Sequence, residues 1–145
     1  VHGITRETCE SRGIDINEAL EKFIDNVKMS DILVAHNIAF DKRMVMVEGI
    51  RNKKLVNQTE IIEYCTMRCG ADVCKIERIS SEGEKYYKKP TLSELYQHYF
   101  KKMPKNTHNA IVDVLICFRC FMIMRYNLDI SKVNRKFRYI IRKNT

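Results

Sequence analysis

A short, continuous apolar run, DILVAHN at residues 31–37, separates two segments that have the spacing of helices. The first segment is 16–27 and the second is 39–54. A run of this kind is typical of a buried parallel strand. Helices that alternate with buried strands limit the chain to α/β folds, so we expect a sheet covered by helices.

The remaining segments fit the same class. Residues 59–67 predict a second strand, and the polar stretch 68–89 predicts a long loop or a hairpin. Residues 91–102 have helical spacing, with Thr91 or Ser93 as the capping residue. Residues 106–126 are apolar on nearly every side, which indicates a central helix packed on a sheet.

Two of the helical segments place apolar residues at helical spacing along one face. In the segment 39–54 the residues at helical spacing are Phe40, Met44, Val47 and Ile50. In the segment 91–102 they are Leu92, Leu95, Tyr96 and Tyr99.

Size and charge describe a basic protein with one domain. The chain has 145 residues and 45% apolar residues, enough for one core, so we expect a single domain over residues 1–145. Lys and Arg number 26 against 18 Asp and Glu, a net charge of +8 that favours phosphate-rich partners. Residues 130–145 form a basic tail that either follows phosphates or is a terminal strand or helix with one solvated face.

The six cysteines do not have the spacing of a small disulfide scaffold, which favours thiols in a reducing compartment, the cytoplasm or the nucleus. No apolar stretch approaches the length of a membrane span and no signal peptide opens the chain, so we expect an intracellular protein that is neither membrane-bound nor secreted. A zinc site built from Cys65, Cys69, Cys74 and His98 is the less favoured alternative.

Polar side chains gather where the predicted strand 31–37 ends. His36 and Asn37 close the strand, and Asp41 lies in the first turn of the next helix, where backbone N–H groups stabilise a carboxylate. In α/β sheets, the carboxyl ends of strands line the ligand crevice. A helix cap with a satisfied polar pair is the other interpretation of these residues.

A second group opens the helix of residues 106–126. His108 precedes the helix and Asp113 follows five residues later, amid apolar neighbours where a carboxylate is costly to bury without a positive partner. Oxygen ligands favour Mg²⁺ or Mn²⁺, and an imidazole can take a proton from water at neutral pH. Asp41, Asp113 and His108 therefore indicate two-metal hydrolysis of a phosphodiester.

These motifs resemble those of the DEDDh group of 3′-to-5′ exonucleases. HNIAFD at residues 36–41, followed by HNAIVD at 108–113, is similar to the second and third motifs of that family. HGIT at residues 2–5 is similar to the segment after its third strand, and EIIEYCTMR resembles its middle strand with Cys65 in place of an acidic residue. The resemblance runs from Val1 to about Tyr126.

The resemblance implies an RNase H-like fold, a central mixed sheet flanked by helices, in which four acidic groups hold two Mg²⁺ or Mn²⁺ ions. Asp41 matches the second-motif aspartate, Asp113 a direct metal ligand, and His108 the general base. Asn37 and Phe40 match positions that contact the terminal nucleotide. The implied partner is a nucleic acid, single-stranded or at a 3′ end, with DNA favoured over RNA.

One family motif is absent. No D-x-E sequence occurs in residues 1–145, although in the family this motif supplies two of the four carboxylates. We expect an N-terminally truncated exonuclease domain that lacks its first strands, which would come from a larger polypeptide, and this chain alone would be inactive or incomplete. The alternative is a non-catalytic nucleic-acid-binding relative of the same fold.

Overall fold

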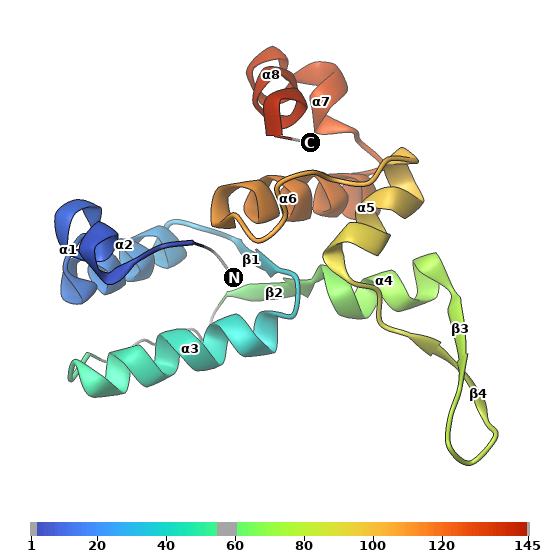
Figure 1. The fold of residues 1–145 in the computed structure, drawn as a ribbon, viewed down its shortest axis with the longest axis horizontal. Coiled ribbons are helices and arrows are strands. Elements are labelled where there is room, and N and C mark those ends of the chain that lie inside the picture. Colours follow the sequence, from blue (N-terminus) through green and yellow to red (C-terminus); the bar gives the residue numbers. More distant parts are fainter. Residues whose placement is uncertain (1–2, 55–60, 145) are drawn as a thin grey trace. The chain divides into compact units, whose positions relative to one another are not determined.

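The computed structural model describes residues 3–54 and 61–144, which form helices and strands grouped in two compact units (Figure 1). The first unit comprises Val1–Leu33 and Ile38–Tyr64, and the second comprises Val34–Asn37 and Cys65–Thr145. The mixture of helices and short strands confirms the expected α/β class. His2, in the HGIT segment, lies outside the described residues, as do Thr59 and Glu60.

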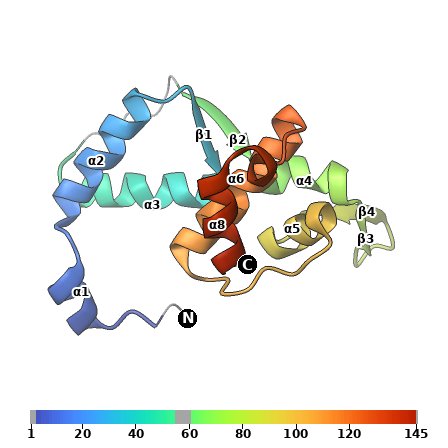
Figure 2. The same cartoon turned by 90° about the horizontal axis from the view of Figure 1, so that it is seen from above.

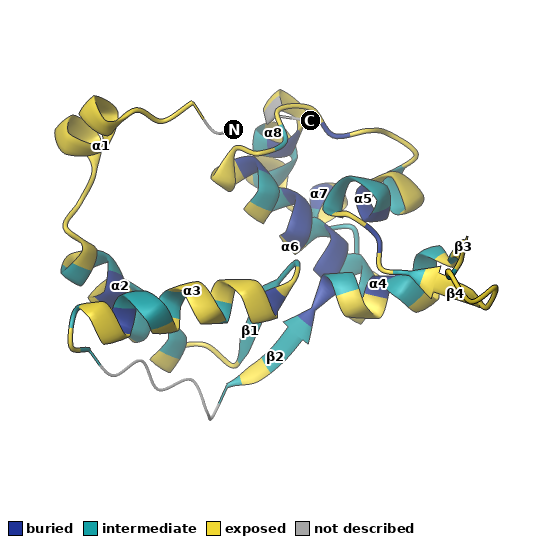
Figure 3. Ribbon diagram, turned by 60° about the horizontal axis from the view of Figure 1, so that its bottom comes forward, coloured by how far each residue is buried: buried dark blue, intermediate teal, exposed yellow. Residues whose placement is uncertain are grey.

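Helix α2 (Ile16–Lys28) confirms the amphipathic helix predicted in the first unit. Asp15 caps it, because its Oδ1 accepts a hydrogen bond of 2.8 Å from the backbone N–H of Asn17. Leu20 is the residue that α2 buries, and α1 (Arg6–Arg12) buries none. Figure 3 shows α1 exposed throughout.

Helix α3 (Ile38–Arg51) lies where the sequence predicts it, but most of the apolar residues at helical spacing are exposed. Phe40, Met44 and Ile50 are 57%, 43% and 71% exposed. The helix instead buries Ile38 and Gly49. Periodicity placed the apolar residues on one face without fixing which side of the helix the unit would cover.

Strands β1 (Ile32–Ala35) and β2 (Ile62–Cys65) confirm both predicted strands and pair in a two-stranded sheet. Each residue of β1 is half-buried, whereas its apolar run predicted a fully buried strand. In β2 only Cys65 is buried. Helix α3 lies in the connection between the two strands.

The core of the second unit is built mainly by two helices that the sequence predicts, α5 (Leu92–Phe100) and α6 (Ala110–Tyr126). Thr91 caps α5 in a capping box: its Oγ1 accepts from Glu94 N at 3.2 Å, and Glu94 Oε2 accepts from Thr91 N at 2.8 Å. The buried residues of this core are Leu95, Tyr96, Val112, Ile116, Cys120 and Ile141.

Helix α6 is central, as predicted, but it packs mainly against helices rather than on a sheet. Its neighbours are α4 (Thr66–Cys74), α5, α7 (Ile130–Val133) and α8 (Arg135–Asn144). Figure 2 shows α8 beside α6. Within residues 3–54 and 61–144, neither α6 nor any other helix is long and apolar enough to cross a bilayer.

The polar stretch 68–89 contains a hairpin, one of the two predicted alternatives. Strands β3 (Ile76–Ile79) and β4 (Lys85–Lys88) pair antiparallel, with Ile76 opposite Lys88. The sequence did not predict α4 before them. Helix α4 packs closely on Pro90, which follows the hairpin, since a Cβ at Gly70 would lie 2.9 Å from Pro90 Cγ.

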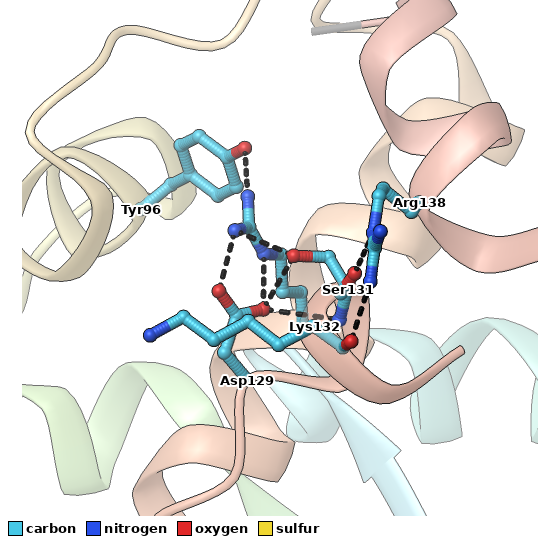
Figure 4. A network of polar contacts seen from close by, with 6 residues as sticks. Tyr96, Asp129, Ser131, Lys132 and Arg138 are labelled. Carbon is cyan, nitrogen blue, oxygen red and sulfur yellow. Dashed lines mark hydrogen bonds and ion pairs between the residues drawn. The ribbon is translucent and has the colours of Figure 1, made fainter. Parts of the chain in front are cut away.

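In the described part of the basic tail, residues 130–144, the chain forms α7 and α8, in agreement with the predicted terminal helix that has one solvated face. Ile141 of α8 is only 2% exposed and joins the core. A polar network holds the preceding turn (Figure 4). Arg119 donates from Nε and Nη2 to the two carboxylate oxygens of Asp129, at 2.9 and 2.8 Å, and from Nη1 to Tyr96 Oη at 2.6 Å.

Candidate active site

His36, at the end of β1, is part of a hydrogen-bonded bridge in the second unit. Its Nε2 lies 3.1 Å from the carbonyl oxygen of Pro90, which can only accept, so Nε2 is the protonated nitrogen. Because burial disfavours the charged imidazolium, Nδ1 carries no proton and accepts from the hydroxyl of Thr66 at 3.0 Å. Burial lowers the pKa of His36, and the bond to Pro90 offsets part of that effect. His36 therefore stabilises the fold as a neutral imidazole, which agrees with the interpretation of a satisfied polar group.

We expect the hydrogen bonds of His36 to make part of the free energy of unfolding sensitive to acid. Because the folded pKa of His36 lies below its ordinary 6.5, its contribution is fully present above that pH and is lost as the pH falls through the folded value. Urea unfolding at several pH values should show a smaller loss of stability on acidification in His36→Gln than in the unchanged chain. The exposed His98 offers the control: His98→Gln should keep the full loss, and an identical loss in both variants would contradict the assignment.

The two residues predicted to contact substrate, Asn37 and Phe40, are both exposed. Asn37 has a φ of 75°, in the left-handed region that Asn tolerates better than most residues, and it turns the chain from β1 into α3. Phe40 lies in the first turn of α3 and is 57% exposed, so its ring is available for stacking.

Asp41 lies in the first turn of α3, as predicted. Partial desolvation raises the pKa of this carboxyl above its ordinary value, and the hydrogen bond to its own backbone offsets part of the shift. No cationic side chain contributes to that shift. A partly desolvated carboxylate without a counter-charge is a suitable oxygen ligand for a divalent cation.

His108 lies at the entrance to α6, as predicted, and its imidazole is exposed. It has a φ of 75°, which is uncommon outside glycine. The next residue, Asn109, caps α6, because its Oδ1 accepts from the backbone N–H groups of Ile111 and Val112 at 3.1 and 3.4 Å. This capping role of Asn109 was not predicted, although Asn before an apolar helix is a recognised capping signal.

Asp113 lies in the first turn of α6 and is half-buried. Its expected apolar surroundings are only partly present, since Ile111 and Val114 are 70% and 66% exposed while Val112 is buried. The carboxylate therefore remains accessible to solvent ions, near the N-terminal end of a helix.

The structure brings two of the three predicted catalytic groups to one helix end. His108 and Asp113 both belong to the second unit, before and within the first turn of α6, and Asp41 belongs to the first unit. In the described part of the chain, no three His, Cys, Asp or Glu side chains are gathered to hold a metal ion.

Comparison with known proteins identifies the family. Residues 1–121 match the exonuclease family, RNase_T. The chain belongs to this exonuclease family. The matched region contains both HNIAFD and HNAIVD, and the match confirms the resemblance to DEDDh-type exonucleases.

A curated relative of this exonuclease chain is a DNA polymerase III PolC-type protein of Mycoplasmopsis pulmonis (strain UAB CTIP). The two are 30% identical over 132 residues, which cover 91% of this chain and 8% of the relative. The exonuclease chain therefore spans a small part of the length of that relative. No solved structure matches it.

Proposed function

We propose that this chain is part of a 3′-to-5′ exonuclease of RNase H-like fold that removes nucleotides from the 3′ end of a nucleic acid inside the cell. The membership of residues 1–121 in the exonuclease family carries the proposal. The name of the relative, a DNA polymerase, favours DNA over RNA as the substrate.

The proposed roles follow from the chemistry of each side chain. His108 is an exposed imidazole that can accept a proton from the attacking water. Phe40 can stack on the terminal base, and Asn37 can donate hydrogen bonds to the same nucleotide.

The carboxylates Asp41 and Asp113 fit a divalent metal, Mg²⁺ or Mn²⁺, because both offer hard oxygen donors in the first turn of a helix. When bound, such ions supply charge that stabilises the phosphate and the leaving oxygen. Two carboxylates are fewer than the four that the family resemblance implies, and residues 1–145 contain no D-x-E sequence. Under this proposal, the other two carboxylates come from a D-x-E sequence, which residues 1–145 do not contain.

The test is a degradation assay on the natural polypeptide that contains this chain, beside the chain alone. We expect single-stranded DNA labelled at its 5′ end to shorten stepwise from the 3′ end in Mg²⁺ or Mn²⁺ and to remain intact in EDTA. The chain alone should show little or no degradation. Shortening from the 5′ end, internal cuts or metal-independent degradation would contradict the proposal.

The absence of D-x-E favours a second candidate, a non-catalytic nucleic-acid-binding relative. It predicts salt-sensitive binding by the natural polypeptide without metal-dependent degradation of either DNA or RNA. The same assay distinguishes the two, since only the exonuclease shortens the labelled strand.

A further inference from the structure

Three-quarters of the net charge of the chain comes from its C-terminal segment. Residues 130–145 contain six Lys and Arg residues and no Asp or Glu. The rest of the chain has twenty Lys and Arg against eighteen Asp and Glu, which almost balance. Because most of the net positive charge lies in so short a segment, we expect this segment to have a function of its own.

Helix α8 displays these charges on one side. At about 100° of rotation per residue, five side chains of α8 fall within an arc of about 120°. All five are exposed, and Tyr139 among them is 69% exposed. We call them the α8 basic face: Arg135, Lys136, Tyr139, Arg142 and Lys143.

The opposite side of α8 is fixed to the second unit. Ile141 is 2% exposed in the core, and the ring of Phe137 packs on that of Phe118, with centroids 5.8 Å apart. The N-terminus is capped, since Asn134 Oδ1 accepts from the backbone N–H of Phe137 at 2.8 Å. Arg138 donates from Nε to the carbonyl oxygen of Ser131 at 2.6 Å. This side chain therefore stabilises the fold and is not counted in the basic face. The basic face is therefore preformed.

We propose that the α8 basic face is a docking surface for the phosphate backbone of single-stranded nucleic acid, separate from the residues proposed for catalysis. Arg135 and Arg142 are seven residues apart, a rise of about 10 Å along the helix, so their side chains can contact different phosphates of one strand. Tyr139 lies between them and offers an exposed ring for a base.

The fold favours a nucleic acid over an anionic membrane as the polyanion. Amphipathic helices bind membranes by inserting their apolar side, but α8 packs Phe137 and Ile141 within the protein. The choice of nucleic acid also rests on the proposed function. The surface itself does not require catalysis, so binding and turnover can be tested apart.

The first experiment measures the salt dependence of binding by the 145-residue chain in EDTA, where metal-dependent degradation is prevented. Fluorescence anisotropy with a labelled single strand of about 20 nucleotides gives the affinity at several KCl concentrations. In the variant Arg135→Gln, Lys136→Gln, Arg142→Gln, Lys143→Gln, we expect the slope of log K against log salt to become shallower by about 3, at ~0.7 per phosphate contact.

A matched control removes four equally exposed cations from another part of the second unit: Arg68→Gln, Arg78→Gln, Lys85→Gln, Lys89→Gln. This control should keep most of the slope, because it changes only the net charge. Equal changes in the two variants, or no change in the first, would overturn the proposal. If the four-residue variant does not fold, each neighbouring pair is changed alone, with an expected change of about 1.4 in slope.

The second experiment tests the ring. Tyr139→Ala should weaken binding to the single strand by about fivefold or more at constant salt, without changing the slope. Tyr86, 51% exposed on the hairpin, supplies the control Tyr86→Ala. An unchanged affinity in Tyr139→Ala would remove the ring from the proposed surface.

Binding to vesicles that contain one-third anionic phospholipid tests whether the α8 basic face binds lipid phosphates instead of nucleic-acid phosphates. Loss of vesicle binding in the four-residue variant, with oligonucleotide binding unchanged, would overturn the proposal. The two proposals can also fail separately. If the chain binds DNA through α8 but the natural polypeptide degrades no nucleic acid, the proposed exonuclease function is refuted and the proposed α8 basic face is not.

Discussion

Replacing Asp129 by Ala should lower the free energy of unfolding by about 3–5 kcal/mol, because it leaves the Arg119 guanidinium largely buried without its carboxylate. The side chains of Arg119 and Asp129 are 14% and 11% exposed and form a two-point ion pair. Asp129 also accepts hydrogen bonds from the N–H and hydroxyl of Ser131, at 3.1 and 2.8 Å. Urea unfolding followed by circular dichroism measures the loss.

The exposed Asp72 on α4 supplies the control, and Asp72→Ala should change stability by less than about 0.5 kcal/mol. Removing both charges in Arg119→Met with Asp129→Ala should be less destabilising than Asp129→Ala alone. The Arg119 guanidinium carbon lies 3.6 Å from the centre of the Phe100 ring, so Met retains an apolar contact there. A double variant less stable than the single one would show that the ion pair is not the source of the effect.

The contribution of the Arg119–Asp129 ion pair to stability should be lost at low pH. Hydrogen bonds from Arg119 lower the pKa of Asp129 from its ordinary 3.8 to about 2. A carboxyl whose folded pKa is depressed contributes stability above its unfolded pKa and loses it as the pH falls through the folded value. The difference in stability between the unchanged chain and Asp129→Ala should therefore narrow from about pH 4 to pH 2.

His108→Ala in the natural polypeptide should lower the turnover of single-stranded DNA by about 10²- to 10⁴-fold, the usual contribution of a general base. Binding should change little, because the exposed imidazole of His108 is expected to act on the attacking water rather than to hold the strand. Steady-state rates, together with the dissociation constant measured in EDTA, separate the two effects.

His98→Ala, which removes an exposed imidazole from α5 of the same unit, should leave the rate unchanged. Added imidazole should restore part of the activity of His108→Ala, since a small base can take the place of the missing side chain. Turnover equal to that of the unchanged protein would refute the proposed role of His108.

Local signals predicted two helices of the second unit, α5 and α6. Thr91 lies three residues before Glu94, and this pair fixes the start of α5 whatever surrounds it. The long apolar segment of α6 leaves no polar side to face water, so a central position follows from the sequence alone.

The burial of α3 and the role of His36 depend on tertiary contacts, which the sequence does not show. Periodicity shows that Phe40, Met44 and Ile50 share a face, but it does not show what covers that face, and these residues are exposed. The sequence places His36 at the end of a strand, whereas its role depends on Thr66 and Pro90, which are distant in the chain. Asp41 was singled out by its place after a strand end and Asp113 by its apolar neighbours, and the motif resemblance then assigned both to the metal site.

The position of Ile141 in the core bears on where this chain can be cut. The family match ends at residue 121, inside α6, which runs from Ala110 to Tyr126. A recombinant fragment trimmed to that homology boundary would shorten α6 and remove both Asp129 and Ile141 from the packing around Arg119 and Ile116. The packed core thus extends about twenty residues past the limit that sequence similarity marks, and we expect a stable recombinant chain to need α7 and α8.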